Sequence, residues 1–223
     1  MTRDGAPGAP WRMADPLWST VASERRELAD LLDTLGPEQW STPSLCAAWT
    51  VHGVVAHLVS VQASGVLGLA RAAVRGVGSP SAVIEYLADQ YVERESAELV
   101  ELLREHAEGR VAPPGMGARA AMTEVMVHRV DIAFPLGLSV ERPAELWRPV
   151  LELLGGRAPR LGTMLEGRPE ASYVASDLDW RSGTGPEVTA PAEALATVLA
   201  GRAAEVGRLT GPGTAAVRAW VTG

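Results

Sequence analysis

Helical periodicity is the feature of this sequence that most restricts its fold. Four long stretches in the first 140 residues place apolar side chains three or four positions apart, the spacing that lines one face of an α-helix. Glycine and proline end these stretches, as at Gly36-Pro37. We therefore predict four amphipathic helices, which favour a four-helix bundle. They cover residues 17–35, 51–74, 81–106 and 118–136.

The pattern changes after residue 140, where shorter segments of both kinds alternate. We predict helices at residues 143–154 and 191–209, strands at 171–175, 188–190 and 215–221, and a glycine-rich turn region at 179–187. This mixture is typical of a small α+β unit. The sequence thus predicts a mainly α protein with three parts. These are a disordered N-terminal tail (residues 1–14), a helical bundle (15–140) and a small α+β domain (141–223).

Charge and cysteine content narrow the class of partner and compartment. The formal net charge is −7 at pH 7, which argues against nucleic acid and against an anionic membrane surface as partners. The single cysteine, Cys46, excludes an intrachain disulfide and fits a reducing compartment. The first ten residues lack the apolar centre of a signal peptide. We expect a cytoplasmic protein, monomeric or dimeric, that acts on a small molecule.

Two of the predicted helices carry residues that can bind a metal ion. Glu124 and His128 are four residues apart, so their side chains lie one turn apart on the same helix face. His57 lies in the second predicted helix and offers another imidazole if the two helices face each other. Three protein ligands leave one coordination position open, as in catalytic zinc sites.

Other interpretations of these residues remain open at this point. A histidine among aliphatic residues is often a hydrogen-bonded core residue, and Glu124 and His128 can form an ordinary surface pair. Asp131 can support a ligand imidazole or simply cap structure. Cys46 follows Leu45 in an apolar loop and no cationic partner is evident, so we expect it to be packed and not nucleophilic.

Several segments together resemble one known family, the mycothiol-dependent maleylpyruvate isomerases, which are DinB-like bundle proteins. The resemblance follows the order of the chain and covers most of it. Its segments are Glu24-Arg25-Arg26-Glu27-Leu28, Leu35-Gly36-Pro37-Glu38-Gln39-Trp40, Trp49-Thr50-Val51, Val54-Val55-Ala56-His57-Leu58, Glu124-Val125-Met126-Val127-His128-Arg129-Val130-Asp131, Ala175-Ser176-Asp177-Leu178-Asp179-Trp180 and Gly201-Arg202-Ala203-Ala204.

The resemblance implies a fold, a cofactor and a cosubstrate. The fold is a DinB-like up-down-down-up four-helix bundle followed by a small α+β C-terminal domain. The cofactor is a divalent metal, usually Zn²⁺, with His57, Glu124 and His128 as its ligands. The cosubstrate is the low-molecular-weight thiol mycothiol. Arg202 best matches the arginine that the C-terminal domain of the family offers to the active site, and the alternative for it is a surface pair with Glu193 or Glu205.

The activity implied by the resemblance is thiol chemistry on a small electrophilic substrate. A thiol that is held as its thiolate can add to a conjugated double bond, which leads to isomerisation, or displace a leaving group, which is S-transfer. Two alternatives remain from the sequence: a non-catalytic metal-binding or ligand-sensing protein on the same bundle, and a bundle that has lost its metal and serves as a scaffold.

Overall fold

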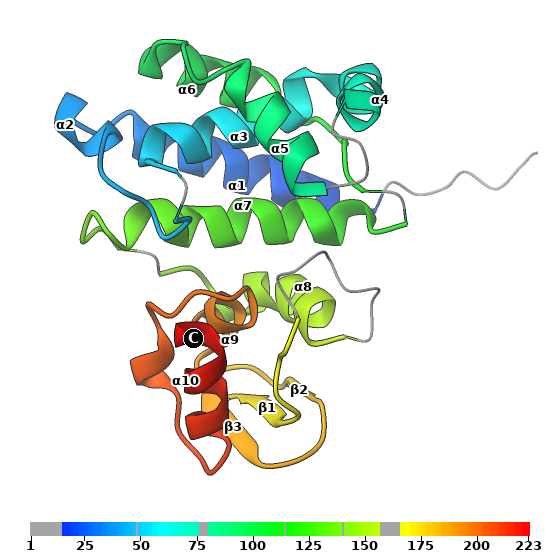
Figure 1. Cartoon of the computed structure of the whole chain (residues 1–223), viewed down its shortest axis with the longest axis vertical. Coiled ribbons are helices and arrows are strands. Elements are labelled where there is room, and N and C mark those ends of the chain that lie inside the picture. The colour runs from blue at the N-terminus through cyan, green and yellow to red at the C-terminus, as the bar shows by residue number, and fades with distance from the viewer. Residues whose placement is uncertain (1–14, 48, 76–79, 114, 140, 157–165) are drawn as a thin grey trace, which may run out of the picture.

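The computed structural model describes residues 15–223 except for 48, 76–79, 114, 140 and 157–165. The predicted N-terminal tail lies outside the described residues. A layer of helices from the first two-thirds of the chain lies on a smaller unit built by the last third (Figure 1). The predicted combination of a helical bundle and a small α+β part is confirmed.

Four helices pack against one another as the bundle. They are α1 (Leu17–Leu32), α3 (Val51–Ala63), α6 (Ser96–Glu105) and α7 (Gly117–Ala133). α1 contacts α6 and α7, and α3 contacts the same two helices. Their facing sides are aliphatic and fully buried, with Val21 and Leu28 on α1, Val55 on α3 and Val130 on α7 as examples. Burial of these faces drives the assembly.

Two of the predicted helices are interrupted. The stretch over residues 51–74 divides into α3 and α4 (Gly65–Arg75), because Gly65 adopts a left-handed backbone with φ +59° that an α-helix cannot continue through. The stretch over 81–106 divides into α5 (Pro80–Asp89) and α6. Here the imidazole of His52 on α3 contacts the Val92 carbonyl at 3.0 Å, which satisfies a backbone group that the break leaves open.

The loop between α1 and α3 contains one short helix, α2 (Pro37–Trp40), and is closed by an isolated β-bridge between Pro43 and Thr50. The Thr50 hydroxyl accepts a hydrogen bond from Gly53 N and so caps α3. Among the described residues no single helix is long and apolar enough to cross a membrane. By length and composition alone, α3 and residues 67–75 of α4 pass that test as a pair bent by 117°.

The small unit is built around a three-stranded sheet in the order β2-β1-β3. Its strands are β1 (Ser172–Ala175), β2 (Arg181–Ser182) and β3 (Glu187–Ala190). β1 pairs with β2 antiparallel and with β3 parallel. β2 lies within the segment that was predicted as a turn region.

At the C-terminal end one prediction was wrong and another was confirmed only in part. The expected strand over residues 215–221 is a helix, α10 (Thr214–Thr222), which buries Val217 and packs Val221, four residues later, on the same face. The expected helix over 191–209 ends early as α9 (Ala192–Leu199), since Gly201 has φ +84°, and a short 3-10 helix follows at Val206–Arg208.

α8 (Ala144–Gly155) joins the two parts, because it packs against α7 on one side and α9 on the other. α9 also contacts α7 directly. Buried residues of both parts form one hydrophobic cluster, so the division at residues 140 and 141 stays a prediction. The consequence for the site is that the end of α9 comes to lie beside α7.

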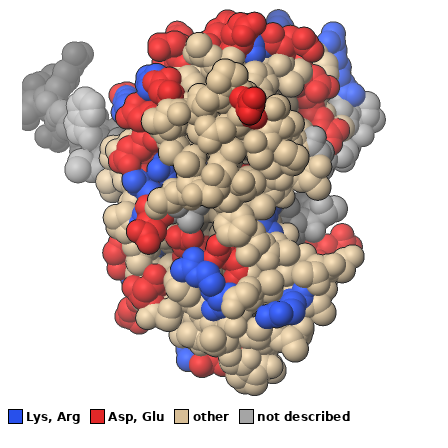
Figure 2. Space-filling view, turned by 90° about the vertical axis from the view of Figure 1, so that its left-hand side faces the viewer, with Lys and Arg blue, Asp and Glu red and all other residues tan. Residues whose placement is uncertain are grey.

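Charged residues of both signs lie on the face of the molecule drawn in Figure 2. Acidic side chains lie mostly along the upper and left edges, basic side chains gather in the lower half, and a broad area of mostly uncharged residues covers the upper, bundle part.

Candidate metal centre

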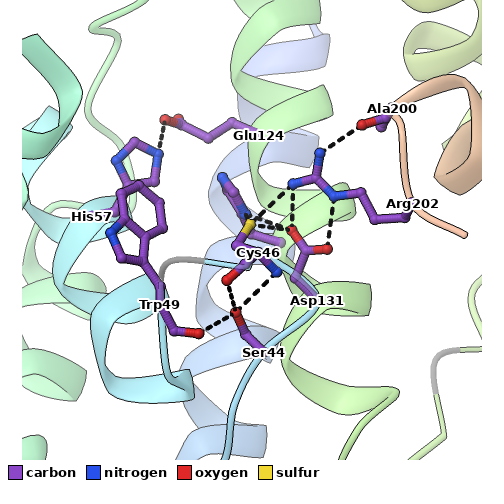
Figure 3. A network of polar contacts seen from close by, with 9 residues as sticks. Ser44, Cys46, Trp49, His57, Glu124, Asp131, Ala200 and Arg202 are labelled. Atoms are coloured by element: carbon purple, nitrogen blue, oxygen red, sulfur yellow. Dashed lines mark hydrogen bonds and ion pairs between the residues drawn. The ribbon is translucent and has the colours of Figure 1, made fainter. Parts of the chain in front are cut away.

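The structure places His57 on α3 close to each of the two predicted ligands on α7, Glu124 and His128. The His57 imidazole Nε2 lies 3.5 Å from the Glu124 carboxylate Oε1. The rings of His57 and His128 stand nearly perpendicular, at 79°, with their centroids 5.1 Å apart. Figure 3 shows His57 and Glu124 pointing toward each other from the two helices. The four-residue spacing on α7 and the packing of α3 against α7 produce this convergence.

Burial controls the protonation of two of these groups. His57 is only 4% exposed, and burial, with a contribution from the nearby His128 charge, lowers its pKa to about 3. Burial also raises the pKa of Glu124, against the opposing charges of His128 and Arg25. His57 is therefore a neutral imidazole at pH 7, which is the form of histidine that binds metals.

The donor groups fit a divalent metal ion. The distance of 3.5 Å between His57 and Glu124 is longer than an ordinary hydrogen bond, so the buried imidazole and the partly buried carboxylate face each other without satisfying each other. His57 Nδ1 is buried and has no hydrogen-bond partner among the described residues. Two imidazoles and a carboxylate are a ligand set that zinc accepts in catalytic sites. Bringing such groups together in the interior is unfavourable unless a cation compensates them.

The indole of Trp49 covers His57 from the α2–α3 loop, with ring centroids 5.0 Å apart. Hydrogen bonds fix this loop: Ser44 Oγ donates to the Trp49 carbonyl at 2.7 Å and accepts from Cys46 N at 3.1 Å. The loop thereby presents Trp49 to one side of the site and Cys46 to the other (Figure 3).

Asp131 holds His128 from the side away from a ligand position. The Asp131 carboxylate is fully buried, and its Oδ2 lies 2.9 Å from His128 Nδ1. Burial alone would lower the pKa of His128, but the hydrogen bonds with Asp131 and Cys46 outweigh burial and raise it to about 9. At pH 7 His128 is therefore protonated when no metal is bound, and Nε2, the ring nitrogen not held by Asp131, would have to release its proton to bind a metal ion. Asp131 thus has the supporting position that was one of its two sequence interpretations.

Arg202 reaches the centre from the small unit. It lies just after Gly201 and not in a helix as the sequence suggested. Its Nε donates to Asp131 Oδ1 at 3.0 Å and its Nη2 to Asp131 Oδ2 at 2.8 Å. These bonds and those from His128 outweigh burial and hold the pKa of Asp131 well below its usual range.

The surface pairing considered for Arg202 is wrong, because Arg208 and not Arg202 contacts the two C-terminal glutamates. Arg208 Nη1 lies 3.3 Å from Glu193 and 2.7 Å from Glu205. Arg202 is instead largely buried against Asp131, which is 71 residues earlier in the chain.

Cys46 also differs from the sequence-based expectation, since it has a cationic partner. Arg202 Nη2 lies 3.1 Å from Cys46 Sγ, and the thiol donates to Asp131 Oδ2 at 3.1 Å. The partner is 156 residues away, so no local signal in the sequence indicated the contact.

A second group of possible ligands overlaps the first. Donor atoms of Cys46, His128 and Asp131 all lie within 4.8 Å of one another. The guanidinium of Arg202 already contacts both Cys46 and Asp131. A metal ion there would compete with an existing cation for the same atoms, so the electrostatics favour the set of His57, Glu124 and His128.

Comparison with known proteins matches the N-terminal part of the chain to one family. Residues 21–114 match the family model of the mycothiol maleylpyruvate isomerase N-terminal domain. The resemblance to this family is confirmed. No curated protein matches the chain significantly.

Two solved structures share the fold across both parts. The mycothiol-dependent maleylpyruvate isomerase superposes with a TM-score of 0.56 at 16% identity, and a histidine-to-alanine mutant of that enzyme with 0.57 at 14%. Each comparison covers 88% of this chain and 90% of the other. At these identities the likeness shows the fold.

Proposed function

We propose that this protein is a metal-dependent enzyme that uses mycothiol as its thiol cosubstrate and acts on a small electrophile by isomerisation or S-transfer. The observation that carries the proposal is the convergence of His57, Glu124 and His128 beside the Arg202–Asp131 pair. The family match over residues 21–114 supports the choice of thiol. A cytoplasmic location is part of the proposal, since that compartment keeps Cys46 and the cosubstrate reduced.

His57, Glu124 and His128 would hold the metal, for which we propose Zn²⁺. When bound, the metal would supply a Lewis acid that stabilises the thiol as its thiolate. Asp131 fixes the orientation of His128 by its contact with Nδ1. The Trp49 ring covers His57 and limits access of water from that side.

Arg202 would act through charge and position. Its fork is already bound to both oxygens of Asp131, so it does not bind a substrate carboxylate with the same atoms in this arrangement. The guanidinium instead holds Asp131 against His128 and places a positive charge at the edge of the centre. A positive charge there would favour a thiolate and an anionic substrate. We propose Arg202 as a catalytic residue in this sense.

Cobalt substitution tests the proposed use of a thiol. Protein loaded with Co²⁺ is titrated with mycothiol while the absorption spectrum is recorded. Coordination of the thiolate is expected to produce a sulfur-to-cobalt charge-transfer band that saturates with mycothiol. The His57→Ala variant is the control and is expected to show no band. A wild-type protein that binds Co²⁺ but gives no band would contradict the thiol function and favour the non-catalytic metal-binding alternative.

A further inference from the structure

The two histidines of the candidate centre are held in different ways. His128 is fixed by a hydrogen bond, since its Nδ1 lies 2.9 Å from the Asp131 carboxylate. His57 Nδ1 is buried and has no hydrogen-bond partner among the described residues. A histidine that binds a metal usually has its other ring nitrogen in a hydrogen bond, which sets the orientation of the ring. For His57 that orientation has to come from another contact.

The contact that covers the face of the His57 ring comes from Trp49. The two ring centroids are 5.0 Å apart and the planes are inclined by 30°, so the rings are closer to stacked than to edge-on. Aromatic pairs at such distances attract each other beyond the effect of the area they bury. The ring of His128 instead meets His57 edge-on, at 79°. The indole therefore restrains rotation of the His57 ring about its χ2 bond.

The loop that carries Trp49 is fixed to α7 by its backbone. Leu45 N donates to the main-chain carbonyl of Asp131 at 3.1 Å. Within the loop, Ser44 N donates to the Trp49 carbonyl at 3.0 Å, and Trp49 N donates to the Cys46 carbonyl at 2.8 Å. The backbone that bears the indole is thus tied to the helix that carries the other two proposed ligands.

Gly53 leaves room for the indole on α3. It is buried and lies four residues before His57, so the two positions share one face of the helix. A Cβ atom at Gly53 would lie 3.1 Å from Trp49 Cβ and 3.3 Å from its Cγ, which is closer than packed side chains normally approach. Glycine inside a helix is less stable than alanine. The sequence therefore gives up helix stability at the position where a side chain would displace the indole.

We propose that Trp49 is a positioning residue that holds the His57 imidazole by ring contact, in place of a hydrogen bond of the kind that holds His128. This rests on the proposed function, since it takes His57 as a metal ligand. Without the indole, the His57 ring can take orientations in which Nε2 no longer faces the Glu124 carboxylate (Figure 3). The apparent metal affinity then falls in proportion to the fraction of the protein that keeps the competent orientation.

The test is a measurement of Zn²⁺ affinity on the full chain by competition with a chromogenic chelator. Trp49→Leu removes the ring but keeps an apolar side chain, and it is expected to weaken affinity by about fivefold. Trp49→Phe keeps a flat ring and is expected to stay within about twofold of the wild type. An equal loss in Trp49→Phe and Trp49→Leu would overturn the assignment to ring contact.

The visible spectrum of Co²⁺-loaded protein gives a second readout, because its absorption bands depend on the geometry of the ligands. Trp49→Leu is expected to change the positions or intensities of these bands, since His57 is no longer held in one orientation. Trp49→Phe is expected to keep them. A change of stability alone would not alter this spectrum.

Trp40→Leu is the matched control. Trp40 is buried in α2 and also meets a histidine of α3, since its ring lies 5.8 Å from that of His52 at an angle of 68°. His52 is not one of the proposed ligands. Trp40→Leu is therefore expected to lower the melting temperature and to leave Zn²⁺ affinity and the Co²⁺ spectrum unchanged. If Trp40→Leu and Trp49→Leu weaken affinity equally, only general stability matters and the inference is overturned.

The outcomes distinguish this inference from the proposed function. A wild-type protein that takes up no Zn²⁺ contradicts the proposed function itself. A wild-type protein that binds Zn²⁺, with Trp49→Leu equal to it in affinity and spectrum, contradicts only the role of Trp49. If circular dichroism shows Trp49→Leu to be unfolded, Gly53→Ala decides, because it keeps the indole but displaces it. That variant is expected to bind Zn²⁺ about threefold more weakly, and wild-type affinity in it overturns the inference.

Discussion

The pair of Arg202 and Asp131 joins the small unit to α7 through a buried contact between opposite charges. Asp131 is fully buried and receives two hydrogen bonds from Arg202, at 3.0 and 2.8 Å. Arg202→Met removes both bonds and leaves the carboxylate inside the protein. Breaking a buried pair from one side typically costs about 3–5 kcal/mol. His128 and Cys46 still donate to Asp131, so we expect the lower end, about 3 kcal/mol.

A double-mutant cycle in urea measures this directly. The free energy of unfolding is determined for wild type, Arg202→Met, Asp131→Asn and the double variant. Each single variant leaves one partner of the buried pair without its hydrogen bonds. We therefore expect the double variant to lose less free energy of unfolding than the sum of the two single variants, with a coupling energy of about 2 kcal/mol. Arg26→Met is the matched control, since the partner of Arg26 is an exposed glutamate, and it should change stability by less than about 0.5 kcal/mol. Additive effects of Arg202→Met and Asp131→Asn would refute the argument that the pair is an energetic link between the two parts.

Three further predictions concern the metal and the charge balance. Protein purified without chelators should contain about one equivalent of divalent metal, mostly zinc, by elemental analysis, and less than about a tenth of an equivalent with no uptake on titration would rule out the site. His128→Ala should lose most Zn²⁺ affinity but keep its helical circular dichroism, since the aliphatic core of the bundle does not depend on the ligands; an unfolded variant at room temperature would make the site structural. Burial raises the pKa of Glu193 although Arg208 contacts it. The charged carboxylate therefore lowers the stability of the folded protein, and this loss appears as the pH rises above the pKa of the unfolded chain, about 4.3. Glu193→Gln should therefore gain stability relative to wild type between about pH 4 and pH 7 in urea melts, and a constant difference across this range would contradict the assignment.

The helices were predictable because their determinants are local. Apolar residues at helical spacing marked α1, α3 and α7, and the structure places helices there. The breaks were missed for a physical reason: periodicity continued across Gly65, where only the backbone angle changed. The segment over residues 215–221 was assigned as a strand from its composition, but Val217 and Val221 also have the four-residue spacing of a helix face, and packing decided in favour of α10.

The site was only partly predictable, because half of it is made by contacts distant in sequence. Glu124 and His128 could be paired from their spacing, and the family resemblance joined His57 to them. The surroundings of Asp131 could not be found in this way. Its contacts with Arg202 and Cys46 span 71 and 85 residues, and they depend on how α9 meets α7 and how the α2–α3 loop folds back.

The family match and the site geometry support different halves of the same conclusion. The matched residues 21–114 include His57, Cys46 and Arg25, but Glu124, His128, Asp131 and Arg202 all lie beyond them. A protein could keep the matched segment and still lack a metal centre. In this chain the remaining groups are present and converge on the matched part: His57 faces Glu124 at 3.5 Å, and Arg202 contacts Cys46 at 3.1 Å. The geometry thus adds an argument for the proposed site that the sequence match alone does not contain, and through Arg202 the small unit contacts Asp131 and Cys46 beside that site.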